Sequence, residues 1–395
     1  MASFSVAFLG CKVSHADAQD VRERLLAEGH DETLEHGDVC VISTCCVTNE
    51  AVAKSRKAAR QAARRFARVY LIGCSANLPG SLGELPDNVR IVTAPSERAA
   101  ELVAGDVGPI GCVQSDARLD RVRAFVKIQD GCSFSCAFCV IPSVRGSSRS
   151  RPAERVLAEV RRRVRQGHRE VVLTGINLGC YRDRNARFDL ARLVRETGAV
   201  PGLDRLRLSS VEVNHVGAEL IAAMRETPAV ALHLHVPLQS GDDGVLRAMG
   251  RRYDSATFLR RLEAAEDFNL TTDVIVGFPS EDDAAFERTI ETVRRAGITK
   301  VHVFPYSPRP GTRTAHADSV PAGVKKLRAA RLRTVSAASC TARWRSKIGE
   351  EDLVLVDRPG RGYGRDYSPW IVTGQLGELI RARAAGVTKE GILAA

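Results

Sequence analysis

The 395-residue sequence has no apolar run close to the roughly 20 residues that a membrane-spanning helix requires. Its opening stretch, MASFSVAFLGCKVSHADAQD, turns polar after residue 11 and has no basic segment ahead of the apolar one, so we expect no secretory leader. With 44% hydrophobic and 27% charged residues, the composition is that of a folded globular protein. We therefore expect a cytoplasmic protein with no membrane segment.

Acidic residues are the smaller charged class, with 47 Asp and Glu against 58 Lys and Arg, which gives a net charge of +11. A positive field favours a polyanionic partner, and nucleic acid is the first candidate. An arginine-rich composition without any special partner would give the same excess, so the charge does not decide between these interpretations. In a reducing compartment, the eleven cysteines favour metal ligands or catalytic thiols over disulfides.

The N-terminal part, residues 4–104, alternates short apolar runs with helical stretches at about 15–28, 49–66 and 96–104. The runs are SVAFLGC, VCVISTC, RVYLIGC and NVRIVT. Such alternation predicts an α/β domain with a doubly wound parallel sheet, which we place at residues 1–105. A weakly patterned, glycine-containing stretch from about 105 to 121 indicates a linker.

A second alternation begins near residue 122 and contains six apolar runs. They are AFVKIQD, EVVLTG, LRLSS, LHLHVPL, TTDVIVGF and KVHVFPY. Six strand–helix units predict an open (β/α)6 barrel at residues 118–347, which ends with a helix at 322–347. The tail at 348–395 has β-rich runs broken by Gly and Pro and predicts a small antiparallel β-barrel.

The stretch DGCSFSCAFCVIP places Cys132, Cys136 and Cys139 on one loop, directly after the first barrel strand. Such folds form their sites at this end of the strands. Three thiolates at this spacing bind three irons of a cubic cluster and leave the fourth iron open, a pattern that resembles the radical S-adenosylmethionine superfamily. The aromatic Phe138 also fits that superfamily, whose residue there borders the adenine. The alternatives are a zinc site with a distant fourth ligand, or incidental cysteines.

Three more cysteines, Cys11, Cys45 and Cys74, each end an apolar run of the N-terminal domain. In a doubly wound sheet, ligands gather beyond the carboxyl ends of the strands, so these thiols are expected to converge on one crevice. The alternative is that cysteine is a common small buried residue at strand ends. The other cysteines are interpreted as structural, Cys180 least firmly: Cys40, Cys46, Cys112, Cys180 and Cys340.

With these motifs in hand, essentially the whole chain resembles the radical S-adenosylmethionine methylthiotransferases. Family members keep three cysteines at strand ends that match Cys11, Cys45 and Cys74. The family's Asn-Thr-Cys is here Ser43-Thr44-Cys45, which assigns the ligand to Cys45 over Cys46. The segments LGCKV, TCCVTNEA, KIQDGCSFSCAFCVIP, HVPLQSG and FPYSPRPGTR are most similar to the MtaB branch, which acts on N6-threonylcarbamoyladenosine beside the tRNA anticodon, although Ser14 replaces the usual Asn.

The resemblance implies two [4Fe-4S] clusters and two molecules of S-adenosylmethionine per turnover. Cys132, Cys136 and Cys139 would hold the radical-generating cluster, and Cys11, Cys45 and Cys74 an auxiliary cluster that carries the sulfur. One S-adenosylmethionine would methylate that sulfur, and the other would give the radical that takes hydrogen from C2 of the adenine. The N-terminal sheet must then dock over the barrel mouth. A low-potential electron donor is implied, without its identity or the sulfur source.

By the same resemblance, several residues at the strand ends are candidates to contact S-adenosylmethionine, although loop capping and turn formation would explain them equally. These are Phe138, Thr174, Gly175, Asn177, Ser209, Glu212, Gln239 and Gly277.

Two groups of residues are candidates for RNA contacts. One follows the cluster loop and could bind phosphates: Arg145, Arg149 and Arg151. The other lies in the tail, which resembles a shortened TRAM module, an RNA-binding barrel, and mixes charges with rings that could stack on bases: Arg361, Tyr363, Arg365 and Tyr367. The basic run RRRVR at 161–165 is interpreted as a solvated helix face instead.

Three functions fit these features. The first is a tRNA methylthiotransferase that acts on threonylcarbamoyladenosine. The second changes the substrate to isopentenyladenosine in tRNA or an aspartate of a ribosomal protein. The third is a non-catalytic iron–sulfur protein that binds RNA. The three-cysteine loop is evidence against this function, because electron-transfer clusters ordinarily have four protein ligands.

Overall fold

The computed structural model describes residues 1–109 and 122–395. Most of the predicted linker, and Cys112 with it, lie outside the described residues. No helix in the described part of the chain is long and apolar enough to cross a membrane.

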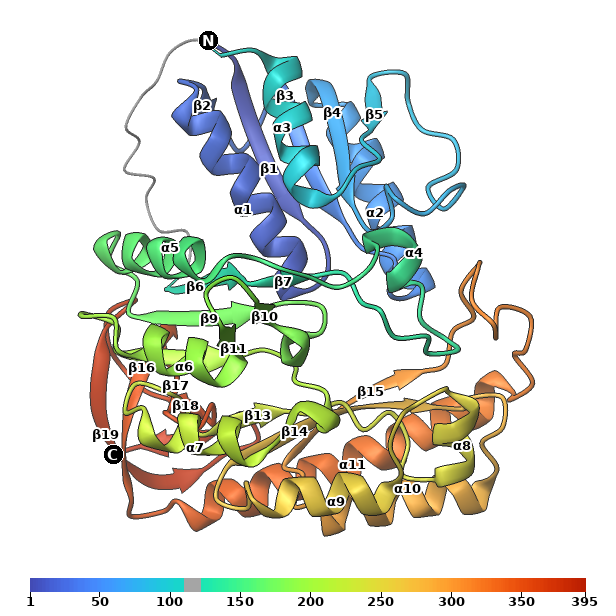
Figure 1. Cartoon of the computed structure of the whole chain (residues 1–395), viewed down its shortest axis with the longest axis vertical. Helices are drawn as coiled ribbons and strands as arrows, with labels where there is room; N and C mark the ends of the chain where they lie inside the picture. Colours follow the sequence, from blue (N-terminus) through green and yellow to red (C-terminus); the bar gives the residue numbers. More distant parts are fainter. Residues whose placement is uncertain (110–121) are drawn as a thin grey trace.

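The N-terminal domain is a five-stranded, fully parallel sheet in the order β2-β1-β3-β4-β5 (Figure 1). Its strands are β1 (Ser3–Phe8), β2 (Asp31–Glu32), β3 (Gly37–Thr44), β4 (Phe66–Gly73) and β5 (Val89–Ile91), and its helices are α1 (Lys12–Ala27), α2 (Asn49–Ala63) and α3 (Ser96–Val107). Alternate residues of β3 point to opposite faces: Val41 packs in the core under α1 and α3, and Ile42 in the core under α2. Both faces are therefore buried, as expected for a doubly wound parallel sheet.

The central domain contains the six predicted barrel strands, all parallel to their paired neighbours. They are β6 (Arg123–Lys127), β9 (Glu170–Thr174), β12 (Arg205–Leu208), β13 (His233–His235), β14 (Asn269–Val276) and β15 (Lys300–Pro305). They form two three-stranded sheets, β12-β9-β6 and β13-β14-β15, which meet through the isolated bridges Leu206–Val230 and Ser210–His235. The open barrel is confirmed, with a seam between β12 and β13.

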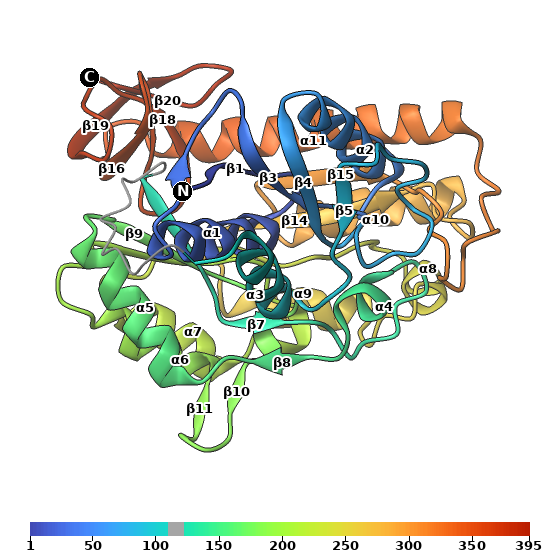
Figure 2. The same ribbon diagram turned by 90° about the horizontal axis from the view of Figure 1, so that it is seen from above.

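Helices cover the outside of this barrel, and α11 runs along its last strand (Figures 1 and 2). These helices are α5 (Ala153–Arg165), α6 (Leu190–Gly198), α7 (Ala218–Glu226), α8 (Asp243–Ala248), α9 (Ser255–Glu263), α10 (Asp283–Arg295) and α11 (Ala322–Ser346). The short helix α4 (Ile141–Arg145) packs instead against the N-terminal domain. The short elements are β7 (Gln129–Asp130), β8 (Arg149–Ser150), β10 (Arg182–Asp183), β11 (Phe188–Asp189) and the 3-10 turns Leu178–Cys180 and Val213–His215.

The C-terminal tail is a closed five-stranded barrel around Trp370 in the order β16-β17-β18-β20-β19. Its strands are β16 (Glu351–Arg358), β17 (Arg361–Tyr363), β18 (Pro369–Ile371), β19 (Leu379–Val387) and β20 (Ile392–Ala394). The predicted antiparallel barrel is correct except for one pair, β18 with β20, which is parallel.

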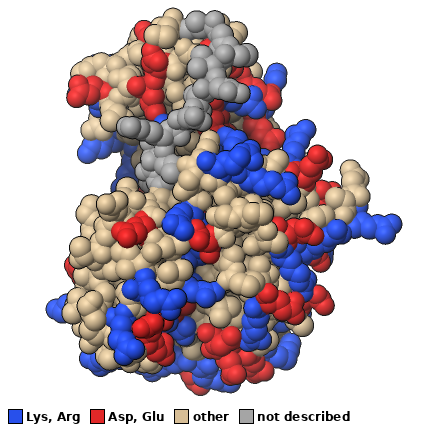
Figure 3. Space-filling view, turned by 90° about the vertical axis from the view of Figure 1, so that its left-hand side faces the viewer, with Lys and Arg blue, Asp and Glu red and all other residues tan. Residues whose placement is uncertain are grey.

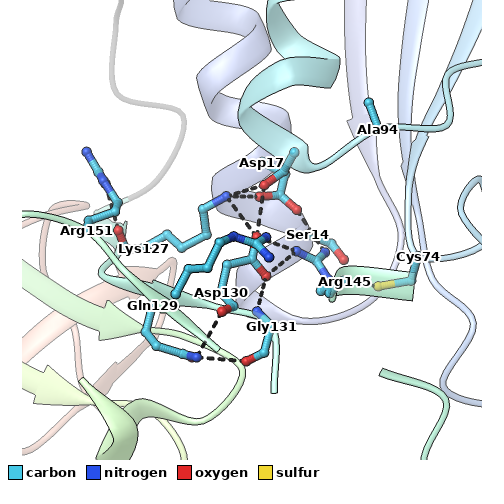
Figure 4. A network of polar contacts seen from close by, with 12 residues as sticks. Ser14, Asp17, Cys74, Ala94, Lys127, Gln129, Asp130, Gly131, Arg145 and Arg151 are labelled. Carbon is cyan, nitrogen blue, oxygen red and sulfur yellow. Dashed lines mark hydrogen bonds and ion pairs between the residues drawn. The ribbon is translucent and has the colours of Figure 1, made fainter. Parts of the chain in front are cut away.

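The sheet domain sits on the barrel through α1, which packs against β6 (Figure 1). Buried ion pairs hold this contact: Lys127 of β6 binds Asp17 of α1 at 2.5 Å, and Arg145 of α4 binds the same carboxylate at 2.8 Å (Figure 4). Arg162 and Arg163 of α5 also bind Glu23 of α1, and Arg163 is buried. The interpretation of 161–165 as a solvated face is therefore wrong at these two residues, which join the domains.

Candidate active site

The loop after β7 brings Cys132, Cys136 and Cys139 together. Burial raises the pKa of Cys139 to about 11, and the neighbouring thiols of Cys136 and Cys132 raise it further. Two donors point at the sulfurs: the Phe134 amide donates to Cys132 Sγ at 3.4 Å, and the Arg251 guanidinium donates to Cys136 Sγ at 3.3 Å. Donors of this kind stabilise thiolates, the form in which cysteine binds a cluster.

The second set of cysteines also converges, at the carboxyl ends of three adjacent strands. Cys11 follows β1, Cys45 follows β3 and Cys74 follows β4. Burial raises the pKa of Cys45 to about 11, and the nearby thiols of Cys74 and Cys11 add to the rise. Gly10 has a φ of +124°, and a Cβ atom there would lie 2.7 Å from that of Cys45, so the close approach of these two loops requires glycine.

Cys46 shares this neighbourhood. A hydrogen bond from Cys46 lowers the pKa of Cys74 to about 7, with Arg145, whose Nε lies 3.0 Å from Cys74 Sγ, lowering it further. The same hydrogen bond raises the pKa of Cys46. The Cys46 side chain packs in a cluster with Cys74, Val140 and Val144. Cys45 is the residue of this pair that neighbours both Cys11 and Cys74.

A cavity of about 180 Å³ lies between the domains, and Cys139 is the one cysteine of the two sets that lines it in the described chain. The loop after Cys46 contributes Val47 and Thr48, and the other loop contributes Cys139 and the ring of Phe138. The barrel wall is formed by Gln239, Asp273, Ile275, Phe304, Tyr306 and Arg309. The expected docking of the sheet over the barrel mouth is thus observed.

Three of the candidate cofactor contacts lie at the end of β9 and on the loop that follows it, beside the cluster loop. Thr174 is buried at the strand end, and Gly175 lies where a Cβ atom would come within 3.0 Å of Gln129 Oε1. The Asn177 amide donates to the same Oε1 at 2.8 Å, and its Nδ2 lies 3.9 Å from Cys132 Sγ. Asn177 Oδ1 is buried with no hydrogen-bond partner in the described residues, so a polar ligand atom could bind there.

The other four candidate contacts to S-adenosylmethionine differ in their surroundings. Ser209 is buried with a hydroxyl that has no partner in the described chain. Glu212 binds Arg251 at 3.3 Å and so lies behind Cys136. Gln239 has a φ of +66° and lines the cavity with Phe138. Gly277 donates its amide to Glu281, and Lys325 fills the place of a Cβ atom, so packing against α11 accounts for this glycine.

The structure corrects most of the predicted RNA contacts near the loop. Arg145 is buried against Asp17, Asp130 and Cys74, because it joins the two domains (Figure 4). Arg151 donates to the Lys127 carbonyl and to Glu159. Arg149 is exposed and bonded only to the neighbouring Ser147 carbonyl among the described residues. It alone of the three is free to meet a phosphate.

The structure also corrects the RNA contacts that were predicted for the tail. Tyr363 and Tyr367 stack on each other at 4.6 Å, and Arg123 of the barrel lies 4.8 Å from the Tyr363 ring. Both rings therefore face the barrel domain instead of an exposed binding surface. Arg361 pairs with Glu390, and Arg365, which is exposed, donates to the Pro228 carbonyl.

Sequence reasoning missed Gln129, Arg251 and Arg309 at this site. Gln129 positions the Asn177 loop, Arg251 bonds to a cluster-loop sulfur, and Arg309 lies beside Cys45 and Cys46. Their partners are distant in sequence, so no local motif could have found them.

On the face shown in Figure 3, basic side chains form separate groups interspersed with acidic ones, so no single positive stripe marks this face.

The thiol sets fit clusters better than single ions. Among the described residues, no group of three His, Cys, Asp or Glu side chains could hold one metal ion. Thiolates that each bind a different iron of a cluster lie further apart than the ligands of one ion. Each set brings three thiols near one another, and three thiolates can bind three irons of a [4Fe-4S] cluster.

Comparisons with known proteins agree with this geometry. Residues 126–293 match the radical SAM superfamily, and residues 3–93 match the uncharacterized protein family UPF0004. A threonylcarbamoyladenosine tRNA methylthiotransferase MtaB from Chlamydia pneumoniae is 32% identical over 99% of this chain and 97% of its own. The Thermotoga maritima protein of the same name is 33% identical over 100% and 96%. A tRNA-2-methylthio-N(6)-dimethylallyladenosine synthase from Cereibacter sphaeroides is 32% identical over 95% and 94%.

Among solved structures, the radical S-adenosylmethionine methyltransferase TsrM from Kitasatospora setae shares the fold, with a TM-score of 0.60 and 13% identity over 79% of this chain and 75% of its own. The fold and the three-cysteine loop define a radical S-adenosylmethionine enzyme. Within that class, the full-length similarity shows that the chain belongs to the methylthiotransferase family. The enzyme uses S-adenosylmethionine and [4Fe-4S] clusters.

Proposed function

We propose that this enzyme adds a methylthio group to C2 of N6-threonylcarbamoyladenosine at position 37 of tRNA, beside the anticodon. The observation that carries the proposal is the cavity between the domains, since sulfur donation and hydrogen abstraction must reach the same carbon. It is lined by Cys139 of the loop set and by Val47 and Thr48, which directly follow Cys45 and Cys46 in the sheet domain. The threonylcarbamoyladenosine enzymes from Chlamydia pneumoniae, Thermotoga maritima and Bacillus subtilis support this substrate.

In this proposal the chain divides into a methylthiotransferase domain at 1–105, a radical core at 118–347 and a TRAM-like domain at 348–395. Cys132, Cys136 and Cys139 hold the radical-generating cluster, and Cys11, Cys45 and Cys74 hold the auxiliary one. When bound, these groups and S-adenosylmethionine supply the adenosyl radical and the methylated sulfur.

The chain's own residues position the reactants. Asn177 Oδ1 and Ser209 Oγ are buried acceptors or donors without partners in the described chain, and they supply polar contacts for S-adenosylmethionine beside Cys132. Phe138, stacked edge-on against Phe278, forms an apolar wall for the adenine. The docked sheet domain contributes Val47 and Thr48 to one wall of the cavity. The reaction takes place in the cytoplasm, where tRNA is available.

Isopentenyladenosine in tRNA is the second candidate, because the Cereibacter sphaeroides synthase is similar over nearly the same length. Mass spectrometry of tRNA nucleosides from cells with and without the gene separates the two. We expect methylthio-threonylcarbamoyladenosine to disappear from the deletion strain and return with the intact gene. If only methylthio-isopentenyladenosine disappears, the second candidate is correct. If neither changes, the tRNA assignment is wrong, and the aspartate of a ribosomal protein becomes the next substrate to test.

A further inference from the structure

A second, larger cavity lies between the barrel strands, α11 and the C-terminal barrel. Its volume is about 840 Å³, within the usual range for small-molecule sites. His233, His235, Thr271 and His302 of β13–β15 form one side, and Tyr363 and Tyr367 of the tail form another. An adjoining void of about 500 Å³ shares Lys12, His233 and both tyrosines with it.

Lys12 is the one residue of the described N-terminal domain that lines either void. It follows Cys11 directly and is the first residue of α1. Burial lowers the pKa of the Lys12 ammonium, which shares the adjoining void with Arg123, Arg207 and Tyr367. A ligand held by Lys12 would therefore lie beside the cysteines that we assign to sulfur donation.

The charges around Lys12 leave it without a carboxylate partner. Within residues 1–109 and 122–395, the half-buried Lys12 ammonium makes no ion pair or hydrogen bond. The acidic residues that line the cavity are already engaged: Asp357 binds Arg123 at 2.5 Å, and Glu390 binds Arg361. Because a partly buried cation without a partner costs free energy, an anionic ligand that enters this cavity gains by pairing with it.

This cavity adjoins the reaction cavity. His235 Nε2 lies 3.2 Å from Asp273 Oδ2, and Asp273 lines the reaction cavity together with Gln239. A substituted adenine in the reaction cavity could thus extend its N6 substituent past this pair. The threonylcarbamoyl group carries hydroxyl and amide groups, which the imidazoles and Thr271 could bind, and it ends in a carboxylate. An isopentenyl group has no charge to pair with Lys12.

We propose that Lys12 binds the carboxylate of the threonylcarbamoyl group and thereby selects this substrate over neutral N6 substituents. The inference rests on the proposed function, because it names the group by which the substrate is recognised. It makes Lys12 a specificity-determining residue in a cavity distinct from the one where chemistry occurs.

The test measures RNA binding by fluorescence anisotropy, using reconstituted full-length enzyme at fixed salt. Three anticodon stem-loops are compared, which carry threonylcarbamoyladenosine, its methyl ester and unmodified adenosine. We expect the wild type to bind the free acid at least about tenfold more tightly than the ester, as for a charge-assisted hydrogen bond. Lys12→Gln should remove that preference and leave ester binding unchanged, whereas Lys12→Arg should keep part of it.

Lys57→Gln, on the exposed surface of α2 in the same domain, is the matched control and should behave as wild type. Iron content is measured for each variant, because Lys12 adjoins Cys11. If Lys12→Gln weakens all three stem-loops equally, Lys12 contacts an RNA phosphate and the proposal is wrong. If the wild-type enzyme binds the free-acid and methyl-ester stem-loops equally tightly, the proposal is wrong, whatever the variants show.

Product analysis on the free-acid stem-loop keeps the two proposals apart. A wild type that forms the methylthio product but shows no acid preference would contradict the Lys12 assignment alone. A wild type that forms no product would contradict the proposed function, whatever its binding preference.

Discussion

The two cysteine sets differ in how the chain brings them together. Cys132, Cys136 and Cys139 lie within eight residues on one loop, so local backbone geometry is enough to gather them. Cys11, Cys45 and Cys74 lie on three loops and meet only because β1, β3 and β4 are parallel neighbours whose carboxyl ends share an edge. The first site depends on a loop, whereas the second depends on the integrity of a whole sheet and on its docking to the barrel.

The largest effect is expected when only the cysteine set on the loop is disrupted. In Cys136→Ala, the loop loses one of its three thiolates, so reductive cleavage of S-adenosylmethionine should fall below detection. Measurement of 5′-deoxyadenosine by chromatography checks this. Iron bound by Cys11, Cys45 and Cys74 should remain, at about half of the wild-type content. Complete loss of iron would show that the two sets do not fold independently.

Next in size is the effect of breaking the dispersed set. Cys45→Ala should still cleave S-adenosylmethionine but form no methylthiolated product, because Cys45 neighbours both Cys11 and Cys74. Cys46→Ala is the matched control: it removes a neighbouring thiol that packs with Val140 and Val144 and loses the hydrogen bond to Cys74, so the product should still form, at a reduced rate. Full product formation by Cys45→Ala, with none by Cys46→Ala, would reverse the assignment.

The contrast also explains what the sequence could predict. The doubly wound sheet and the six barrel strands followed from apolar periodicity, and the loop site from its spacing. The dispersed site followed from topology, because each cysteine ends a buried strand. The roles of Arg145, Tyr363 and Tyr367 did not follow, because exposed arginines and tyrosines look the same in sequence as those that contact another domain. The role of Lys12 could not be predicted from the sequence either, because its surroundings come from three separate parts of the chain.

Arg145 tests whether the dispersed set depends on domain docking. It binds Asp17 and Asp130 and donates to Cys74 Sγ, with only 4% of its side chain exposed. Arg145→Met leaves the buried Asp17 and the partly buried Asp130 with Lys127 as their remaining ion-pair partner, so we expect a loss of about 3 kcal/mol in stability, measured by urea unfolding. The auxiliary cluster should be lost at lower urea than the loop cluster, and simultaneous loss would contradict the dependence.

The smallest expected effect concerns Asp20 of α1, which faces Lys127 across the same interface. Burial raises the pKa of Asp20 to about 7, and Glu159 and Asp17 add to the rise while Lys127 opposes it. A carboxyl whose pKa is raised on folding stabilises the protein below its unfolded pKa and loses that contribution as the pH rises through 7. Asp20→Asn cannot ionise, so its melting temperature should exceed that of the wild type at pH 8 by a few degrees, and the difference should shrink toward pH 5. Asp31→Asn, on the exposed edge strand β2, is the control and should show no such trend. An Asp20→Asn effect that is independent of pH would mean that Asp20 is ionised throughout and that the interface around Lys127 is more solvated than its geometry indicates.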